Sequence, residues 1–380
     1  MDGIIELHKG RLNELNKNLS LAEKLRFVHS VIRDCLGCVD RIAVALYDSK
    51  TDLLKNFLHS SDEDHPLVQY QAKLSEAGSL LTVFRSGQGR VVNDLAAFEY
   101  GEHVHTRQID EQGFQSSYTL PIYHNGLFLG FIFFDSYQKH SFQLEVLHEL
   151  DLFGQVISSM ITSELVTIRM MLATVQTARQ MAAFHDTETG LHTDRVSHYA
   201  RLIAQRLAPT YGFNDEYIEH LFLFAPLHDV GKIGLPDAVL KKAERLSEEE
   251  FEEMKEHVVI GRRIIDAILQ DFGLDSFPRA EMLRNIAEYH HEAVDGSGYA
   301  IGLRGKQIPI EARIIAVADI FDALTSRRRY KVAWTNDEAF HLLERLAGFK
   351  LDPDCVAALV ESRKAVEEIQ SRFKEIPPGS

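Results

Sequence analysis

One stretch of this chain is almost free of residues that interrupt a helix. Residues 141–184 contain no proline and a single glycine, Gly154. Apolar side chains recur along the stretch at intervals of three and four, which is close to a coiled-coil seam; they are Ile157, Ile161, Leu165, Ile168, Leu172 and Val175. Because an ordinary helix has about 12 residues, we expect one long helix over residues 141–184. It would connect two domains and pair two subunits in a homodimer, and a helix that packs on its own domain is the alternative.

The segment before this helix has the pattern of a mixed α and β domain. A helical pattern is followed by a short β-branched run at residues 41–47, which is typical of a buried strand. Further along, two apolar runs flank Asn125 and Gly126, a dipeptide that strongly favours a tight β-hairpin. We therefore predict an antiparallel sheet with helices over residues 15–155.

From about residue 186 onward the sequence predicts helices. Their expected ranges are residues 195–207, 216–227, 248–269, 281–289, 311–324 and 337–346. Ser247 and Glu250 have the spacing of a capping box at the start of the third of these helices. This pattern predicts an all-α domain over residues 185–372.

Composition limits the partners of the chain. The formal net charge of −15 argues against sequence-independent DNA binding, which needs a basic surface. The longest apolar run, at residues 127–134, is shorter than the about 20 residues of a membrane-spanning helix. The chain starts without the pattern of a secretory signal, and three cysteines in 380 residues fit a reducing compartment. We expect a cytoplasmic protein that binds neither DNA nor a membrane.

Histidines and acids are concentrated in the helical part. Five histidines and three acids fall on successive helical segments, and they are Glu188, His192, His228, Asp229, His257, His290, His291 and Asp319. Taken singly, each has an ordinary alternative, such as a satisfied core histidine at His257 or a helix end at Asp229. An aspartate inside an apolar helix, such as Asp319, is nevertheless costly unless it is paired or bound to a metal. Eight ligands exceed the needs of one ion, so the set predicts two or three ions.

The chemistry of this set narrows the choice of metal and substrate. Imidazole and carboxylate without thiolate suit Fe, Mn, Ni or Zn. Lys232 follows four residues after His228, and Arg328 and Lys331 follow Asp319, so these cations can supply donors to phosphate oxygens. Asp322 is either a cap or an acceptor behind a ligand.

The ordered motifs resemble those of the HD-GYP phosphodiesterases, a branch of the HD superfamily, from about residue 183 to residue 370. They comprise Glu188, His192 and Arg195; His228, Asp229, Gly231 and Lys232; Met254, His257 and Gly261; His290, His291, Glu292, Asp295, Gly298 and Tyr299; Arg313 and Asp319; and Arg328, Tyr330 and Lys331. The resemblance implies hydrolysis of cyclic dinucleotides, chiefly cyclic di-GMP, to the linear dinucleotide or GMP. It also implies that the eight residues above bind two or three ions, Fe or Mn, with Glu188 typical of the three-metal form.

The same resemblance implies roles for further residues. Asp229 and Lys232 would be catalytic, and the substrate would contact Lys232, Tyr299, Arg313, Arg328 and Lys331. Ala300 stands where the family has proline, and so does Arg329. These departures leave two alternatives open: a hydrolase of another cyclic dinucleotide, or a non-catalytic receptor. The receptor would engage a signalling partner through the loop Gly298-Tyr299-Ala300.

The first domain resembles a GAF sensory domain. The resemblance rests on the strand at residues 41–47, on the predicted hairpin and on the long helix that leaves the domain. It implies an unknown small ligand that regulates the second domain. The expected architecture is therefore multidomain α+β: a GAF-like α/β sensor with an antiparallel sheet, a connecting helix and an all-α HD-GYP domain.

Overall fold

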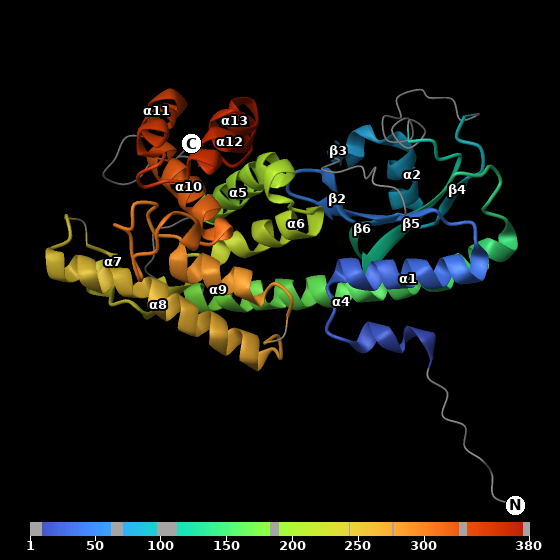
Figure 1. Cartoon of the computed structure of the whole chain (residues 1–380), viewed down its shortest axis with the longest axis horizontal. Helices are drawn as coiled ribbons and strands as arrows, with labels where there is room; N and C mark the ends of the chain where they lie inside the picture. Colours follow the sequence, from blue (N-terminus) through green and yellow to red (C-terminus); the bar gives the residue numbers. More distant parts are fainter. Residues whose placement is uncertain are drawn as a thin grey trace, which may run out of the picture. The chain divides into compact units, whose positions relative to one another are not determined.

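Figure 1 shows the computed structural model of the chain, which describes residues 10–61, 71–96, 112–182, 190–242, 244–275, 277–326 and 333–374. The chain divides into two compact units, Met1–Thr167 and Ile168–Ser380. The first unit contains a sheet with helices, the second is built of helices, and one long helix contains residues of both. The predicted multidomain α+β architecture is therefore confirmed.

Over the described residues of the first unit, the sheet has six strands, all paired antiparallel. They are β1 (Arg41–Asp48), β2 (Leu53–Ser61), β3 (Gln71–Lys73), β4 (Arg90–Val92), β5 (Ser116–His124) and β6 (Leu127–Ser136), in the order β3-β2-β1-β6-β5-β4. The predicted hairpin joins β5 and β6. Asn125 and Gly126 have φ values of 48° and 78°, the left-handed conformation that a two-residue hairpin turn of this kind requires.

Among the helices that pack on the sheet of the first unit are two that precede the hairpin. Helix α1 (Leu21–Leu36) contacts β1 and β2, and its His29 hydrogen-bonds to Ser60 on β2. Helix α2 (Gly78–Ser86) places Leu80 and Val83 in a cluster with Ala43 of β1 and Phe131 of β6. The register pairs Ala45 with Phe131 and Ala43 with Phe133, so one face of the sheet supplies this apolar core.

Helix α4 (Leu144–Ala182) is the predicted long helix (Figure 1). Its apolar stripe is covered within a single chain, since Ile157 and Ile161 are 0% exposed and Leu165 and Ile168 are 2% exposed. The stripe is therefore not the free dimer seam that its spacing predicted, and the alternative of packing within the chain is the one observed. Homodimer formation stays a prediction without that support.

Part of α4 is apolar enough to resemble a membrane span. Leu144–Val175 meets the length and hydropathy of a crossing helix, and 28% of its most apolar window is buried. A single helix of this kind is a weak indication, because core helices of globular proteins meet the same criterion. Residues of the stripe such as Ile157 and Ile161 are buried, whereas most of that window is not. Cellular location stays a prediction.

The second unit contains nine named α-helices after α4 in its described part. They are α5 (Gly190–Tyr211), α6 (Asp215–Phe224), α7 (Asp237–Leu240), α8 (Glu248–Asp271), α9 (Ala280–Tyr289), α10 (Ile310–Thr325), α11 (Asn336–Leu346), α12 (Pro353–Val360) and α13 (Arg363–Arg372). All six helices predicted for this region are present. The predicted capping box of Ser247 and Glu250 begins α8.

Helix α10 lies at the centre of this unit. It contacts α5, α9, α11 and α12, and Ile314, Ile315 and Val317 on it are fully buried. A helix that is apolar on nearly every side is typical of such a central position. Two carboxylates in the C-terminal half of α10, Asp319 and Asp322, therefore need partners on neighbouring helices.

Candidate metal centre

His228 and Asp229 lie between two short 3₁₀ helices, Ala225–Leu227 and Val230–Gly234. The second of these approaches α8 very closely at Gly231. A Cβ atom at Gly231 would lie 1.8 Å from the carbonyl oxygen of His257 and 2.4 Å from the backbone nitrogen of Gly261. Only glycine fits this contact, and the contact brings Asp229 against His257.

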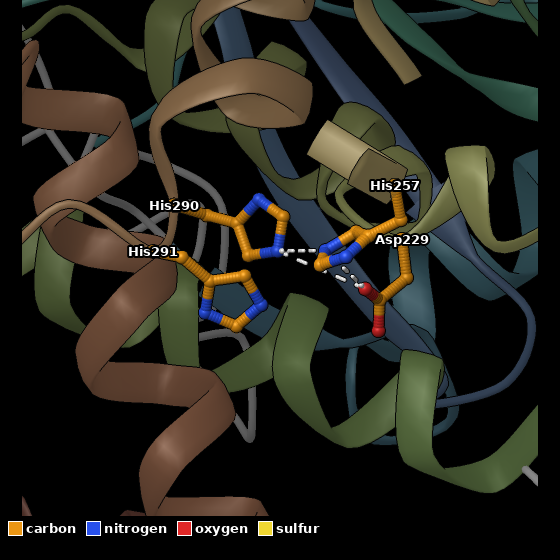
Figure 2. Close-up of side chains that lie close together, drawn as sticks. All are labelled: Asp229, His257, His290 and His291. Atoms are coloured by element: carbon orange, nitrogen blue, oxygen red, sulfur yellow. Dashed lines mark hydrogen bonds and ion pairs between the residues drawn. The ribbon is translucent and has the colours of Figure 1, made fainter. Parts of the chain in front are cut away.

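Four side chains form the first cluster, which contains Asp229, His257, His290 and His291 (Figure 2). Oδ1 of Asp229 lies 3.4 Å from Nε2 of His257 and 3.7 Å from Nε2 of His290. The two Nε2 atoms are 3.5 Å apart. One ligand atom from each of the four residues can lie within 4.8 Å of all the others, a grouping compact enough to surround one metal ion.

The second cluster contains His192 of α5, His228 and Asp319 of α10. Nε2 of His192 lies 3.6 Å from Oδ1 of Asp319. Asp229 joins the two clusters, because its Oδ2 lies 3.2 Å from Nε2 of His228 while its Oδ1 faces the first cluster. One carboxylate thus offers its two oxygens to two groups of ligands, as a carboxylate does when it bridges two ions.

Hydrogen bonds fix the orientation of four imidazole rings. In each, Nδ1 lies against an oxygen acceptor and must carry the proton: Ala225 O at 2.8 Å for His228, Met254 O at 2.7 Å for His257, Ile286 O at 3.0 Å for His290 and Asp322 Oδ2 at 2.8 Å for His192. In a neutral ring the lone pair is then on Nε2. The four Nε2 atoms therefore present lone pairs to the two clusters.

Several of these ligand atoms are buried without a hydrogen-bond partner. They are Nε2 of His192 and Oδ1 of Asp229, together with Nε2 of His228, which faces only Oδ2 of Asp229 at 3.2 Å. A buried acceptor without a donor costs about 1–3 kcal/mol. Between His257 and His290, moreover, two lone-pair nitrogens face one another. Cations at the two clusters would satisfy all of these atoms, so the donor set fits metal ions.

The charge states of the residues agree with this assignment. Burial lowers the pKa of His257 to about 4 and that of His291 well below its ordinary value, so both rings are neutral at pH 7, the form that binds metals. Burial also acts on His228, but the Asp229 carboxylate outweighs it and raises the pKa of His228 to about 9. A metal ion must displace that proton, so metal affinity should rise with pH.

Asp322 supports the second cluster from behind. Besides His192, it accepts hydrogen bonds from Arg195, from Nε to Oδ1 at 2.6 Å and from Nη2 to Oδ2 at 3.0 Å. Burial would raise the pKa of Asp322, but the hydrogen bonds from His192 and Arg195 lower it. The carboxylate is therefore charged and fixes the ring of His192. Of the two roles that the sequence left open, the acceptor behind a ligand is the one observed.

Of the predicted substrate-contacting residues, Lys232 and Tyr299 lie beside cluster residues and Arg313 does not. Lys232 donates from Nζ to Oδ2 of Asp229 at 2.7 Å, and the Tyr299 ring lies 4.8 Å from that of His291. Arg313 donates from Nε to Ile308 O at 3.0 Å and from Nη1 to Asp352 at 2.6 Å. These contacts of Arg313 are with the fold and not with either cluster, so its role as a substrate contact stays a prediction.

Three predicted site residues, Glu188, Arg328 and Lys331, lie outside the described residues. Whether Glu188 completes a third metal position therefore stays a prediction. Sequence reasoning assigned no role to Arg195 or Glu292, although both lie in the quoted motifs. The sequence could have indicated a role for both, because each is a charged residue close in sequence to a ligand histidine.

Comparison with known families identifies the domain type of the second unit. Residues 171–355 match the family model described as an HD domain, so this part of the chain is an HD domain. It contains all the described residues of the two metal clusters.

The relatives of this domain include named enzymes. The chain is 43% identical over 190 residues to the cyclic di-GMP phosphodiesterase response regulator RpfG of Xanthomonas campestris pv. campestris, covering 50% of this chain and 47% of RpfG. It is 37% identical over 174 residues to the 3'3'-cGAMP-specific phosphodiesterase 2 of Vibrio cholerae, covering 46% of this chain and 31% of that protein. The chain thus spans less than half the length of these relatives.

One solved structure similar to the chain is the phycocyanobilin-bound GAF domain from a cyanobacterial phytochrome. The similarity has a TM-score of 0.34 and 14% identity, and it covers 40% of this chain and 91% of the GAF domain.

Proposed function

We propose that this chain is a metal-dependent phosphodiesterase that hydrolyses a cyclic dinucleotide, with cyclic di-GMP as the first candidate substrate. The observation that carries the proposal is the position of Asp229, which directs one oxygen toward each of the two clusters of buried ligand side chains. Paired ions of this kind serve in-line displacement at phosphorus. The names of RpfG and related proteins support the substrate class.

The proposed cofactors are two or three divalent transition-metal ions, Fe or Mn. The described residues supply one group of ligands for each of two ions, and Glu188 is the candidate for a third. Imidazole and carboxylate donors without thiolate suit these metals. Such ions, when bound, act as Lewis acids and lower the pKa of water near phosphorus.

Hydrolysis breaks the bond between phosphorus and the 3′ oxygen, forms a bond from phosphorus to the oxygen of water and returns a proton to the 3′ oxygen. Asp229 would orient both clusters toward the same phosphate. Lys232 lies beside Asp229, where its ammonium can donate to a non-bridging phosphate oxygen and stabilise the developing charge. Tyr299 stands beside His291 and would contact the nucleotide. Arg328 and Lys331 are proposed further phosphate contacts.

A second substrate has specific support. The relatives include proteins named as specific for 3'3'-cGAMP, with 37% and 35% identity. Position 300, next to Tyr299, is alanine where the family has proline. This difference would alter the loop that meets the nucleotide and so the preference for one base over another. A non-catalytic receptor is less favoured, because Asp229 and all the described ligand histidines of the motifs are present in the two clusters.

We further propose that the first unit regulates the second through α4, which contains residues of both units. A small ligand of the first unit would be the signal. A cytoplasmic location completes the proposal, with the sequence arguments given above as its support. A homodimer is kept as a prediction that the covered stripe of α4 does not support. A signalling partner at the loop Gly298-Tyr299-Ala300 is also proposed.

The test is turnover by metal-loaded protein, purified without oxygen and incubated with cyclic di-GMP or 3'3'-cGAMP, with products separated by chromatography. We expect linear dinucleotide or mononucleotide from at least one substrate. Asp229→Ala should abolish both metal binding and turnover, whereas Tyr299→Phe should keep its metal. Tight binding of the dinucleotide without turnover would instead support a receptor, and full activity in Asp229→Ala would contradict the site.

A further inference from the structure

Glu292 directly follows the two ligand histidines His290 and His291, and it is only 5% exposed. Its carboxylate accepts hydrogen bonds from three successive backbone N–H groups, those of Ile301 at 2.8 Å, Gly302 at 3.0 Å and Leu303 at 3.0 Å. Hydrogen bonds to an ionised acceptor are roughly twice as strong as neutral ones. One buried side chain therefore holds both ends of the loop of residues 293–303 together.

The loop turns back on the metal-binding segment in a tight path. The backbone N–H of Tyr299 donates to the carbonyl oxygen of His291 at 3.2 Å. At Gly298, a Cβ atom would lie 2.3 Å from the backbone nitrogen of Ala293 and 2.5 Å from the carbonyl oxygen of His291. No other residue fits there without moving the backbone. The loop thus lies directly on the segment that carries the ligands.

This path places Tyr299 at the first metal cluster. Its ring centroid is 4.8 Å from that of His291 and 6.3 Å from that of His257. The ammonium of Lys255 lies 5.7 Å from the same ring. Tyr299 is thus packed beside two ligand histidines, with a cation on α8 nearby. Its position depends on the loop being closed.

We propose that Glu292 is a positioning residue for substrate. Its carboxylate closes the loop of residues 293–303 and so sets Tyr299 beside His291, where a cyclic dinucleotide bound at the metals meets the ring. This inference rests on the proposed function. Ala300 lacks the ring that would fix φ in proline, so the loop is held by hydrogen bonds, and those to Glu292 are the ones that a single side chain makes to three successive N–H groups.

The test is Glu292→Gln. The amide keeps one acceptor oxygen, but its NH₂ group must face the N–H of Leu303 or of Ile301 and Gly302, so part of the clamp is lost. Hydrogen exchange measured by mass spectrometry should be faster for the amides of residues 301–303. Metal content should be unchanged, and KM for the cyclic dinucleotide should rise by about tenfold with a smaller change in kcat.

Glu311→Gln is the matched control. Glu311 is also a buried carboxylate of the second unit, and it accepts hydrogen bonds from the Tyr217 hydroxyl and the Asn285 amide. The same substitution there should leave KM and the exchange of residues 301–303 unchanged. If Glu292 acts through Tyr299, adding Glu292→Gln to Tyr299→Ala should raise KM little further, because the two effects are then not additive.

Three outcomes would overturn the inference. Unchanged exchange at residues 301–303 in Glu292→Gln would show that the carboxylate does not hold the loop. Faster exchange with an unchanged KM would show that the loop does not position substrate. Loss of metal would make Glu292 a support of the histidines instead. If the wild-type protein turns over no cyclic dinucleotide, the proposed function fails separately from this inference. The affinity for the cyclic dinucleotide is then measured in place of KM. An affinity that is the same in Glu292→Gln as in the wild type overturns the inference.

Discussion

His192 and Asp322 are joined by a hydrogen bond of 2.8 Å between Nδ1 and Oδ2, although they are 130 residues apart in the sequence. This contact fixes the ring of a ligand on α5 from a carboxylate on α10. Nε2 of the same ring is buried without a partner and lies 3.6 Å from Asp319. Asp322 therefore decides where the lone pair of His192 points, and Asp319, three residues earlier on the same helix, shares the resulting site.

Asp322→Asn should weaken metal binding at the second cluster. The substitution removes the negative charge behind His192 and places an amide beside Arg195, so the affinity for metal should fall by about 10–100-fold. Competition with a coloured chelator measures this affinity. Asp237→Asn is the control, because Asp237 is an exposed carboxylate paired with Lys241. Equal affinities in the two variants would contradict the assigned role of Asp322.

Gly231→Ala should destabilise the second unit and disturb the first cluster. The new Cβ would lie 1.8 Å from the carbonyl oxygen of His257, and overpacking of this kind costs about 1–3 kcal/mol. Gly261→Ala, on the other side of the same contact, is the control. Its Cβ would lie 3.4 Å from the backbone nitrogen of Gly231 and 3.6 Å from the side chain of Ala287, which are ordinary contacts. Chemical denaturation should show a loss of stability for the first variant alone. Similar stability in both would contradict the close approach.

Lys232→Met should reduce turnover more than metal binding. The side chain is close in length to lysine but cannot donate to a phosphate oxygen, so kcat should fall by about 100-fold. Elemental analysis should find nearly as much metal as in the wild type. Lys241→Met, at an exposed position, should retain full turnover. Unchanged kcat in Lys232→Met would exclude this residue from the catalytic machinery.

The stability of the first unit should fall in mild acid because of His29. Burial lowers the pKa of this ring, which is held by Ser60 and by the carbonyl oxygen of Val39. The unfolded chain then binds more protons below about pH 6.5, so stability is full above that pH and falls by up to about 1.4 kcal/mol per pH unit beneath it.

Denaturation at about pH 7.5 and about pH 5.5 checks this, with His29→Gln as the variant. The loss on acidification should be smaller in His29→Gln, which has no ring to protonate. The exposed His341 offers the control, since His341→Gln should behave as the wild type. An equal loss in all three proteins would mean that His29 is not buried in its neutral form.

The sequence predicted the helices of the second unit well, because long amphipathic segments carry a strong periodic signal. The hairpin at Asn125 and Gly126 was equally clear, since few sequences adopt two successive left-handed residues. Helix α2 and strands β3 and β4 were not predicted. Each is short, and the two strands have three residues each, so tertiary contacts rather than local pattern decide them.

The apolar stripe of α4 shows a second limit. Spacing of three and four identifies a buried helical face, but it does not say whether another segment of the chain or a second copy covers it. The burial of Ile157 and Ile161 within one chain decides in favour of the former.

The metal ligands could be predicted because imidazoles and carboxylates in apolar helices require partners. Their division into two clusters could not, since it depends on contacts between distant segments. The approach of Gly231 to His257 and the hydrogen bond from His192 to Asp322 are such contacts. The use of both Asp229 oxygens follows from them and not from any local pattern.

The most direct test of the account is the metal content of the second unit in the whole chain. Elemental analysis of protein purified without oxygen should find about two or more transition-metal ions per chain, one for each described cluster. Asp229→Asn should lower this content strongly, since the carboxylate that faces both clusters loses its charge. One ion or none per wild-type chain, or an equal content in Asp229→Asn, would contradict a metal centre that Asp229 helps to hold.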